Sequence, residues 1–160
     1  MKRRMYLLLA CMLLSANLAS AADNNAPWGH ASLEEVAYKP QKVVYDVAVS
    51  SVSAFTNVLD RVSYLNTIYQ ADPFESSIVI VLHGNEIPFF AIKNYPRHKE
   101  LMARAQSLVN SGNIRFRMCK LAAQGQGFEP GDIHGFVEVV PMADAEIVRL
   151  QQEEHHAYMR

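Results

Sequence analysis

The chain has 160 residues, half of which are hydrophobic, and a formal net charge of −1 at pH 7. This length fits one domain whose core is large enough to fold without disulfide bonds. The 15 basic residues do not outnumber the 16 acidic ones, so the composition gives no indication of a nucleic-acid-binding surface.

Residues 1–21 have the pattern of a secretory signal peptide. Basic residues at positions 2–4 precede an apolar run, Met5 to Leu14, and Ala19-Ser20-Ala21 has the small-x-small form of a cleavage site. The run is shorter than the roughly 20 apolar residues that span a membrane. We therefore expect cleavage before Ala22, a periplasmic or secreted protein, and no stable membrane insertion of the mature chain.

Two cysteines remain to be explained. Cys11 follows Leu9-Ala10 as in a lipobox, so lipidation at Cys11 is the alternative to simple cleavage. If the leader is removed, 12 basic residues face 16 acidic ones, a net charge near −4, and Cys119 is the remaining cysteine. A single cysteine in an exported chain is buried and inert, paired between chains, or a functional thiol.

Strand and helix patterns alternate after an irregular N-terminal arm at residues 22–41. Apolar, β-branched runs predict strands at Lys42–Val49, Ser77–Leu82, Ile114–Met118 and Phe136–Val140. Apolar residues at three- and four-residue steps predict helices at 52–69, 94–109 and 143–152. A helical turn is expected at 87–91, and a short helix at 120–124 that Gly125 and Gly127 end.

This alternation predicts that residues 42–160 form one α/β domain. The expected architecture is a three-layer α/β/α sandwich, flavodoxin- or Rossmann-like, around a mainly parallel sheet of four to five strands. Ligands and chemistry collect at the carboxyl ends of the strands in such sheets. His83 ends the second predicted strand and Cys119 ends the third, so both belong to this end of the sheet and could be neighbours.

Cys119 is the strongest chemical candidate. Between a strand and a helix, unpaired backbone N–H groups and the helix dipole favour thiolate, which is the reactive form. Lys120 could stabilise that thiolate if it turns inward. The alternative is a buried cysteine that acts as a small apolar side chain.

Other candidates surround the predicted strand ends. His83 could act as an acid or base or orient a ligand, but it could equally be a histidine hydrogen-bonded at a strand end. Gly84 and Asn85 could line a ligand site there, with helix capping as the alternative for Asn85. Asp46, the charged interruption of the first strand, could be a site or interface carboxylate, or could cap a helix or face solvent.

No cofactor or metal is predicted. Gly125-Gln126-Gly127 closes a helix and so is not a dinucleotide-binding fingerprint. His134 and the adjacent pair His155-His156 lack a second cluster with ligand spacing, and adjacent tail histidines are typically exposed. The residues contain no nucleophilic serine motif and no paired carboxylates, and they leave open whether the chain is an enzyme.

The segment Cys119-Lys120-Leu121-Ala122-Ala123, with Gly127 eight residues after the cysteine, resembles the DsrE/DsrF-like family. That family includes the sulfur-relay subunits of the DsrE and TusD type. Four further segments resemble an exported, mostly uncharacterised branch of it: YDV at 45–47, ADPF at 71–74, VLHG at 81–84 and PMADAEIVRLQ at 141–151. The resemblance covers nearly the whole mature domain.

The resemblance implies that Cys119 carries sulfur as a persulfide between a donor and an acceptor protein, and that the chain forms trimers or hexamers. Two departures bear on this activity. Relay proteins are cytoplasmic, and their cysteine is commonly followed by an Arg-Gly pair, where this chain has Gln126-Gly127. Two other interpretations therefore stay open: a non-catalytic oligomeric protein that binds a ligand near His83, and a partner-binding subunit. An accessible Cys119 would favour sulfur transfer, and a deeply buried one would favour the others.

Overall fold

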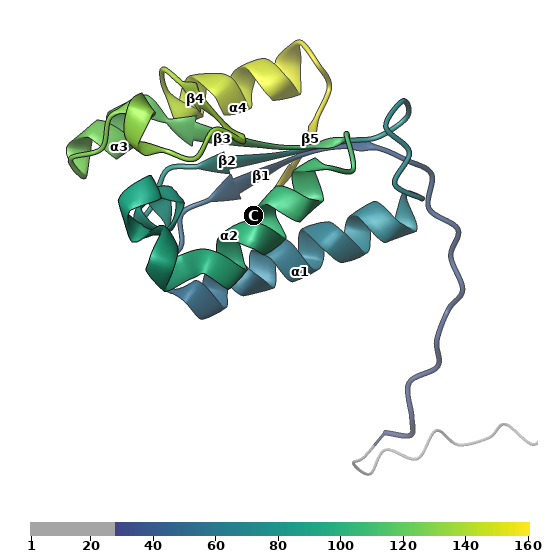
Figure 1. Cartoon of the computed structure of the whole chain (residues 1–160). Coiled ribbons are helices and arrows are strands. Elements are labelled where there is room, and N and C mark those ends of the chain that lie inside the picture. The colour runs from purple at the N-terminus through teal and green to yellow at the C-terminus, as the bar shows by residue number, and fades with distance from the viewer. Residues whose placement is uncertain (1–27) are drawn as a thin grey trace, which may run out of the picture. The chain divides into compact units, whose positions relative to one another are not determined.

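A five-stranded sheet lies between two layers of helices in the computed structural model, which describes residues 28–160 (Figure 1). All strand pairings are parallel, and the strand order is β4-β3-β2-β1-β5. The strands are β1 (Lys42–Val47), β2 (Ser77–Leu82), β3 (Ile114–Cys119), β4 (Val137–Val140) and β5 (Ala157–Met159). The predicted α/β/α fold with a parallel sheet is confirmed.

Within residues 28–160, four α-helices accompany the sheet: α1 (Val52–Ile68), α2 (Tyr95–Val109), α3 (Lys120–Gly125) and α4 (Ala143–Gln152). Helices α1 and α2 cover one face and α4 covers the other (Figure 1). Three short 3-10 helices, at Ile87–Phe90, Ile92–Asn94 and Pro130–Asp132, complete the connections. Among residues 28–160, no helix combines the length and the apolar character needed to cross a membrane.

The predicted bounds of β3 and β4 are each one residue off at one end, and the larger differences are at β1 and β5. β1 ends at Val47, two residues before the expected end, and the three-residue β5 was not predicted. β5 exists because Ala157–Met159 pairs with residues 43–45 of β1, a contact between the two ends of the domain. The three residues carry no periodic pattern of their own.

Residues 28–36 belong to a unit separate from the compact unit Ala37–Arg160; they are irregular and exposed. The predicted signal peptide, its cleavage site and Cys11 lie outside the described residues. All the features described below belong to Ala37–Arg160.

Strands β1 and β2 are buried on both faces, which explains their nearly continuous apolar sequences, whereas β3 alternates apolar residues with Arg115 and Arg117. One set of alternating residues, including Ile78, Ile80 and Phe116, packs with α1 and α2 in the larger core. The other set packs under α4 in a smaller core, whose buried members are Val44, Val79, Val81, Cys119, Ala143, Ile147 and Leu150. Cys119 therefore belongs to the apolar layer beneath α4.

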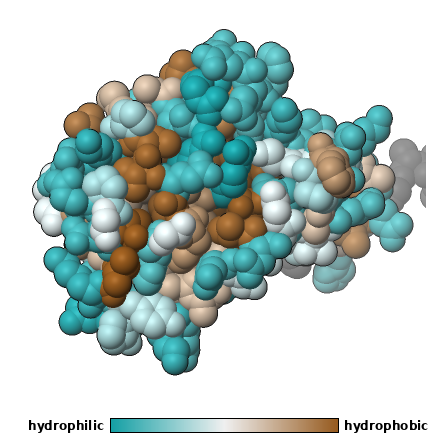
Figure 2. Space-filling model, turned by 45° about the horizontal axis from the view of Figure 1, so that its top comes forward, coloured by the Kyte–Doolittle hydropathy of each residue, from teal (hydrophilic) through white to brown (hydrophobic). Residues whose placement is uncertain are grey.

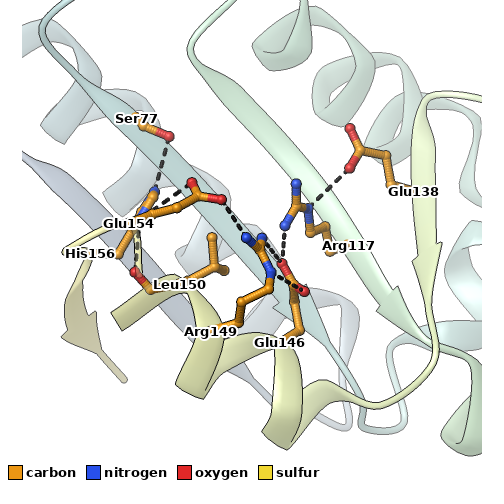
Figure 3. A network of polar contacts seen from close by, with 8 residues as sticks. All are labelled: Ser77, Arg117, Glu138, Glu146, Arg149, Leu150, Glu154 and His156. Atoms are coloured by element: carbon orange, nitrogen blue, oxygen red, sulfur yellow. Dashed lines mark hydrogen bonds and ion pairs between the residues drawn. The ribbon is translucent and has the colours of Figure 1, made fainter. Parts of the chain in front are cut away.

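A network of charges also joins α4 to the sheet (Figure 3). Arg117 on β3 bonds to Glu146 on α4, and its Nε donates to Glu138 on β4 at 3.0 Å. Arg149 adds a second cation, with its Nη2 at 2.7 Å from a Glu146 carboxylate oxygen. The side chains of Arg117 and Glu146 are each 10% exposed, so each charge depends on the other for compensation.

His156 corrects the expectation that both tail histidines are exposed. His155 is exposed, whereas His156 is 3% exposed and lies between α4 and β2. Its Nε2 is 3.1 Å from the Ser77 hydroxyl and its Nδ1 is 3.2 Å from the Leu150 carbonyl (Figure 3). These bonds fix the chain immediately before β5.

Candidate functional site

Asp46, His83 and Cys119 lie at the carboxyl ends of three neighbouring strands. The ladder between β1 and β2 extends to His83, whose N–H donates to the carbonyl of Val47 at 3.1 Å. The ladder between β2 and β3 ends with Leu82 opposite Met118, so His83 and Cys119 are the next residues on the two strands. Because side chains alternate along a strand, Asp46 and Cys119 both belong to the face that α4 covers.

An ion pair joins Asp46 to His83, with Asp46 Oδ1 at 2.5 Å from His83 Nε2. The other carboxylate oxygen accepts a hydrogen bond from the Tyr158 hydroxyl of β5. Burial opposes the charge on Asp46, but the hydrogen bonds from Tyr158 and His83 outweigh burial and lower its pKa. Asp46 is therefore an ionised acceptor that orients His83, and it does not cap a helix.

The hydrogen bond to Asp46 determines which nitrogen of His83 is available. An ionised carboxylate can only accept, so Nε2 carries the hydrogen that lies between the two groups. In the neutral ring, Nδ1 is then the nitrogen that can accept a hydrogen bond or a proton. The His83 side chain is 28% exposed, so solvent and ligands can reach it.

Glu86 holds the loops after β1 and β2 together. Its side chain is fully buried, and its two oxygens accept hydrogen bonds from the backbone N–H groups of Val49 and Gly84, each at 2.8 Å. Burial raises the pKa of Glu86, and these hydrogen bonds oppose that change. Gly84 fits between the loops because it has no side chain: a Cβ there would lie 2.5 Å from the Cα of Ala48.

Cys119 is largely enclosed. It is 5% exposed, packs with Ala143 and Ile147 of α4, and is the N-cap residue of α3. Lys120 is exposed. The hydrogen bonds of residues 28–160 include none between the thiol and His83, so the two groups are neighbours along the strand ends without direct bonding.

Gln126 links the turn after α3 to the His83 loop. Its Nε2 donates to the carbonyl of Gly84 at 2.9 Å. Gly127, with φ of +77°, ends α3 as predicted, since the N–H of Phe128 bonds back to Ala123. The residue that departs from the relay pattern thus connects the cysteine-bearing segment to the histidine-bearing loop.

A cavity of about 320 Å³ opens beside His83 and Asp46, between β1 and α1. Asn57, Arg61 and Arg160 also line it. Cys119 and Asn85 do not, and Asn85 is exposed. The volume is at the small end of the range for small-molecule sites.

No metal site emerges from the part of the chain that the structure describes, where no three His, Cys, Asp or Glu side chains are grouped suitably. His134 is separate from the candidate site and stacks on Phe136. Of the predicted site residues, the structure thus brings together Asp46, His83, Gly84 and the end of β3 at Cys119.

Two residues that matter to this geometry, Tyr158 and Arg61, were not predicted. Tyr158 contacts Asp46 only because β5 pairs with β1, and Arg61 lines the cavity as one residue of an amphipathic helix. Charged residues on the outer face of a helix are common, so the sequence around Arg61 did not indicate that this residue lines a cavity.

No protein-family model matches the chain, and no curated protein matches it. A solved structure, that of a protein of unknown function, MTH1491, from Methanobacterium thermoautotrophicum, is similar to it. The two chains are 22% identical, the match covers 75% of this chain and 98% of that one, and the TM-score is 0.55. This likeness supports the α/β fold.

Proposed function

We propose that this protein handles sulfur through Cys119, with His83 and Asp46 as its acid–base pair. The observation that carries the proposal is that His83 and Cys119 directly follow Leu82 and Met118, the last residues that β2 and β3 pair with each other, while Asp46 orients His83. A histidine held by a carboxylate beside a cysteine is an arrangement that can activate a thiol.

In the proposed step, His83 accepts the proton of the Cys119 thiol. The thiolate attacks the outer sulfur of a donor persulfide, so one S–S bond forms and one breaks, and the donor leaves as a thiolate that can take the proton from His83. Cys119 then holds a persulfide that an acceptor thiol can attack in the same way. Since Cys119 is 5% exposed, both steps require local opening of the layer that covers it.

The intact mass of the mature protein after exposure to a persulfide donor, with and without reductant, tests this proposal. We expect a reductant-labile gain of about 32 Da per sulfur that is absent in Cys119→Ser. His83→Ala should slow the gain roughly tenfold or more, because the thiol loses its base. His30→Ala, which removes an exposed histidine of the N-terminal unit, is the matched control.

An unmodified Cys119 that also resists alkylation until the protein unfolds would contradict the proposal. That result would support the second candidate, a non-catalytic protein that binds a small ligand in the cavity beside His83. The burial of Cys119 and its absence from the cavity lining favour this alternative. A third candidate is a partner-binding subunit, for which we expect neither a persulfide on Cys119 nor a ligand bound in the cavity.

The wider proposal is that the chain is a DsrE-like protein, exported to the periplasm or secreted, and assembled as a trimer or hexamer. Large apolar side chains on the α3 and α4 side are compatible with assembly, since Leu121 is 59%, Met142 42% and Val148 58% exposed. Figure 2 brings this side forward and shows apolar residues in groups among hydrophilic ones. A sulfur donor or acceptor protein is the other partner that this proposal implies.

A further inference from the structure

We infer that Gln126 is a positioning residue for the proposed reaction. It holds the main chain directly after His83, so that Nδ1 of this histidine can reach the Cys119 thiol once the layer above the cysteine opens. The inference rests on the proposed function and adds a residue that acts through the His83 loop. It starts from the way in which this loop is fixed.

Two side chains hold the main chain of Gly84, the residue directly after His83. Its N–H donates to Glu86 at 2.8 Å, and its carbonyl accepts a hydrogen bond from Gln126 Nε2 at 2.9 Å. The N–H of Ile87 reaches the same carbonyl at a longer distance of 3.4 Å. Glu86 joins this loop to the loop after β1, whereas Gln126 joins it to the segment after β3.

The main chain of Gln126 is itself fixed. Gln126 is the C-cap residue of α3, and its N–H donates to the carbonyl of Ala123 at 3.0 Å. Two residues later, Phe128 is 6% exposed in the larger core, and its N–H bonds back to the same carbonyl. Because α3 begins directly after Cys119, the Gln126 side chain extends from a short segment that carries the cysteine at one end and is anchored in the core at the other.

The imidazole of His83 needs two fixed points. Asp46 holds Nε2, at the far end of the ring, at 2.5 Å. Nδ1, the proposed proton acceptor, is bonded to the ring carbon that carries Cβ, so its position follows the main chain of His83. If that main chain shifts, the ring turns about its contact with Asp46 and Nδ1 moves away from the end of β3. A general base must lie within hydrogen-bond reach of its proton, and a misplacement of about 1 Å can cost about a hundredfold in rate.

The test is a double-mutant cycle on the rate at which Cys119 of the full mature chain reacts with glutathione persulfide and, separately, with iodoacetamide. Both reactions require removal of the thiol proton. Gln126→Met keeps the length of the side chain and removes its N–H donors. We expect this variant to react about tenfold or more slowly than its parent where His83 is present, and no more slowly than its parent in the His83→Ala background.

Two further variants separate positioning from a general loss of structure. Gln124→Met is the matched control on the same helix, because Gln124 is exposed and bonds only to exposed Glu129, at 3.2 Å; it should keep the wild-type rates. Gln126→Arg retains N–H donors on a long side chain and should recover most of the rate that Gln126→Met loses. Thermal unfolding confirms that each variant is folded at the temperature of the assay.

Wild-type rates in Gln126→Met, or the same loss of rate with and without His83, would overturn the inference and leave the sulfur-transfer proposal standing. A faster reaction in both backgrounds would also overturn it, because Gln126 would then only restrict access to the thiol. If the wild type forms no persulfide but its alkylation shows the loss that depends on His83, positioning stands and sulfur transfer is removed. A thiol that reacts with neither reagent would remove both.

Discussion

Gly84 and Glu86 show how single residues shape the candidate site. Glu86 is buried and forms no ion pair with any of residues 28–160, and a buried carboxylate is tolerated only where hydrogen bonds compensate it. The N–H groups of Val49 and Gly84 do so from the two loops that surround His83. Gly84 lets these loops approach so closely that no side chain fits between them.

Gly84→Ala should therefore destabilise the protein and displace His83. The added Cβ would lie 2.5 Å from backbone of Ala48, so the loops must separate, at a cost of about 1–3 kcal/mol in the free energy of unfolding. Urea unfolding measures this cost. Gly131→Ala is the matched control, because a Cβ there meets nothing within 4 Å. Equal free energies of unfolding for the two variants would show that the close approach of Gly84 to Ala48 does not limit stability.

Helix α4 both covers Cys119 and depends on a buried ion pair. Ala143 and Ile147 on its inner face pack in the same apolar layer as the cysteine. One turn along, Glu146 bonds to Arg117 of β3 where both side chains are 10% exposed. The pair fixes the position of α4 because neither charge is tolerated alone at that depth.

Glu146→Ala should lower the free energy of unfolding by about 3–5 kcal/mol, because Arg117 stays buried without its main counter-ion. It should also speed alkylation of Cys119, since α4 then separates more readily from the sheet. The exposed pair of Asp60 and Arg104 supplies the control, and Asp60→Ala should cost about 1 kcal/mol or less. If Arg117→Met/Glu146→Leu does not recover most of the lost stability, a role of Glu146 beyond pairing is indicated.

The last residues of the domain form the edge of the sheet beside β1. β5 adds the outermost strand next to β1, and His156 fixes the chain just before it through Ser77 and Leu150. Burial lowers the pKa of His156 from its ordinary value of 6.5, although the Leu150 carbonyl and Glu154 oppose this effect. His156 is therefore neutral in the folded protein near pH 7.

Stability should fall as the pH falls below about 6.5. Below that pH, His156 takes up a proton more readily in the unfolded chain than in the folded protein. The stabilising contribution of neutral His156 is therefore fully present above the pKa of the unfolded chain, and it is lost as the pH falls toward the lower pKa of the folded protein. The slope is at most about 1.4 kcal/mol per pH unit for one group. Urea unfolding between pH 5 and 8 should show a flatter profile for His156→Gln. The exposed neighbour gives the control, His155→Asn, which should keep the wild-type slope. The same slope in all three proteins would exclude His156 as the cause.

Most of the fold and part of the site could be predicted from the sequence. Val43, Val79 and Phe116 lie in apolar runs whose period is a local property, so strands and helices follow without knowledge of the partners. His83 and Cys119 could be assigned to one end of the sheet because parallel strands place their carboxyl ends together. Whether they contact each other depends on strand register and side-chain burial, which no local pattern contains.

Local sequence patterns were sufficient to predict the alternation of strands and helices, the parallel sheet, and the end of the sheet at which the candidate residues lie. Three features became apparent only in the folded chain: Cys119 lies under α4, Asp46 orients His83, and Tyr158 and Arg61 complete the surroundings. This is because periodicity records only which side of an element is buried. Burial of a thiol, pairing of a carboxylate and closure of a cavity arise from residues that are up to 112 positions apart, as Asp46 and Tyr158 are.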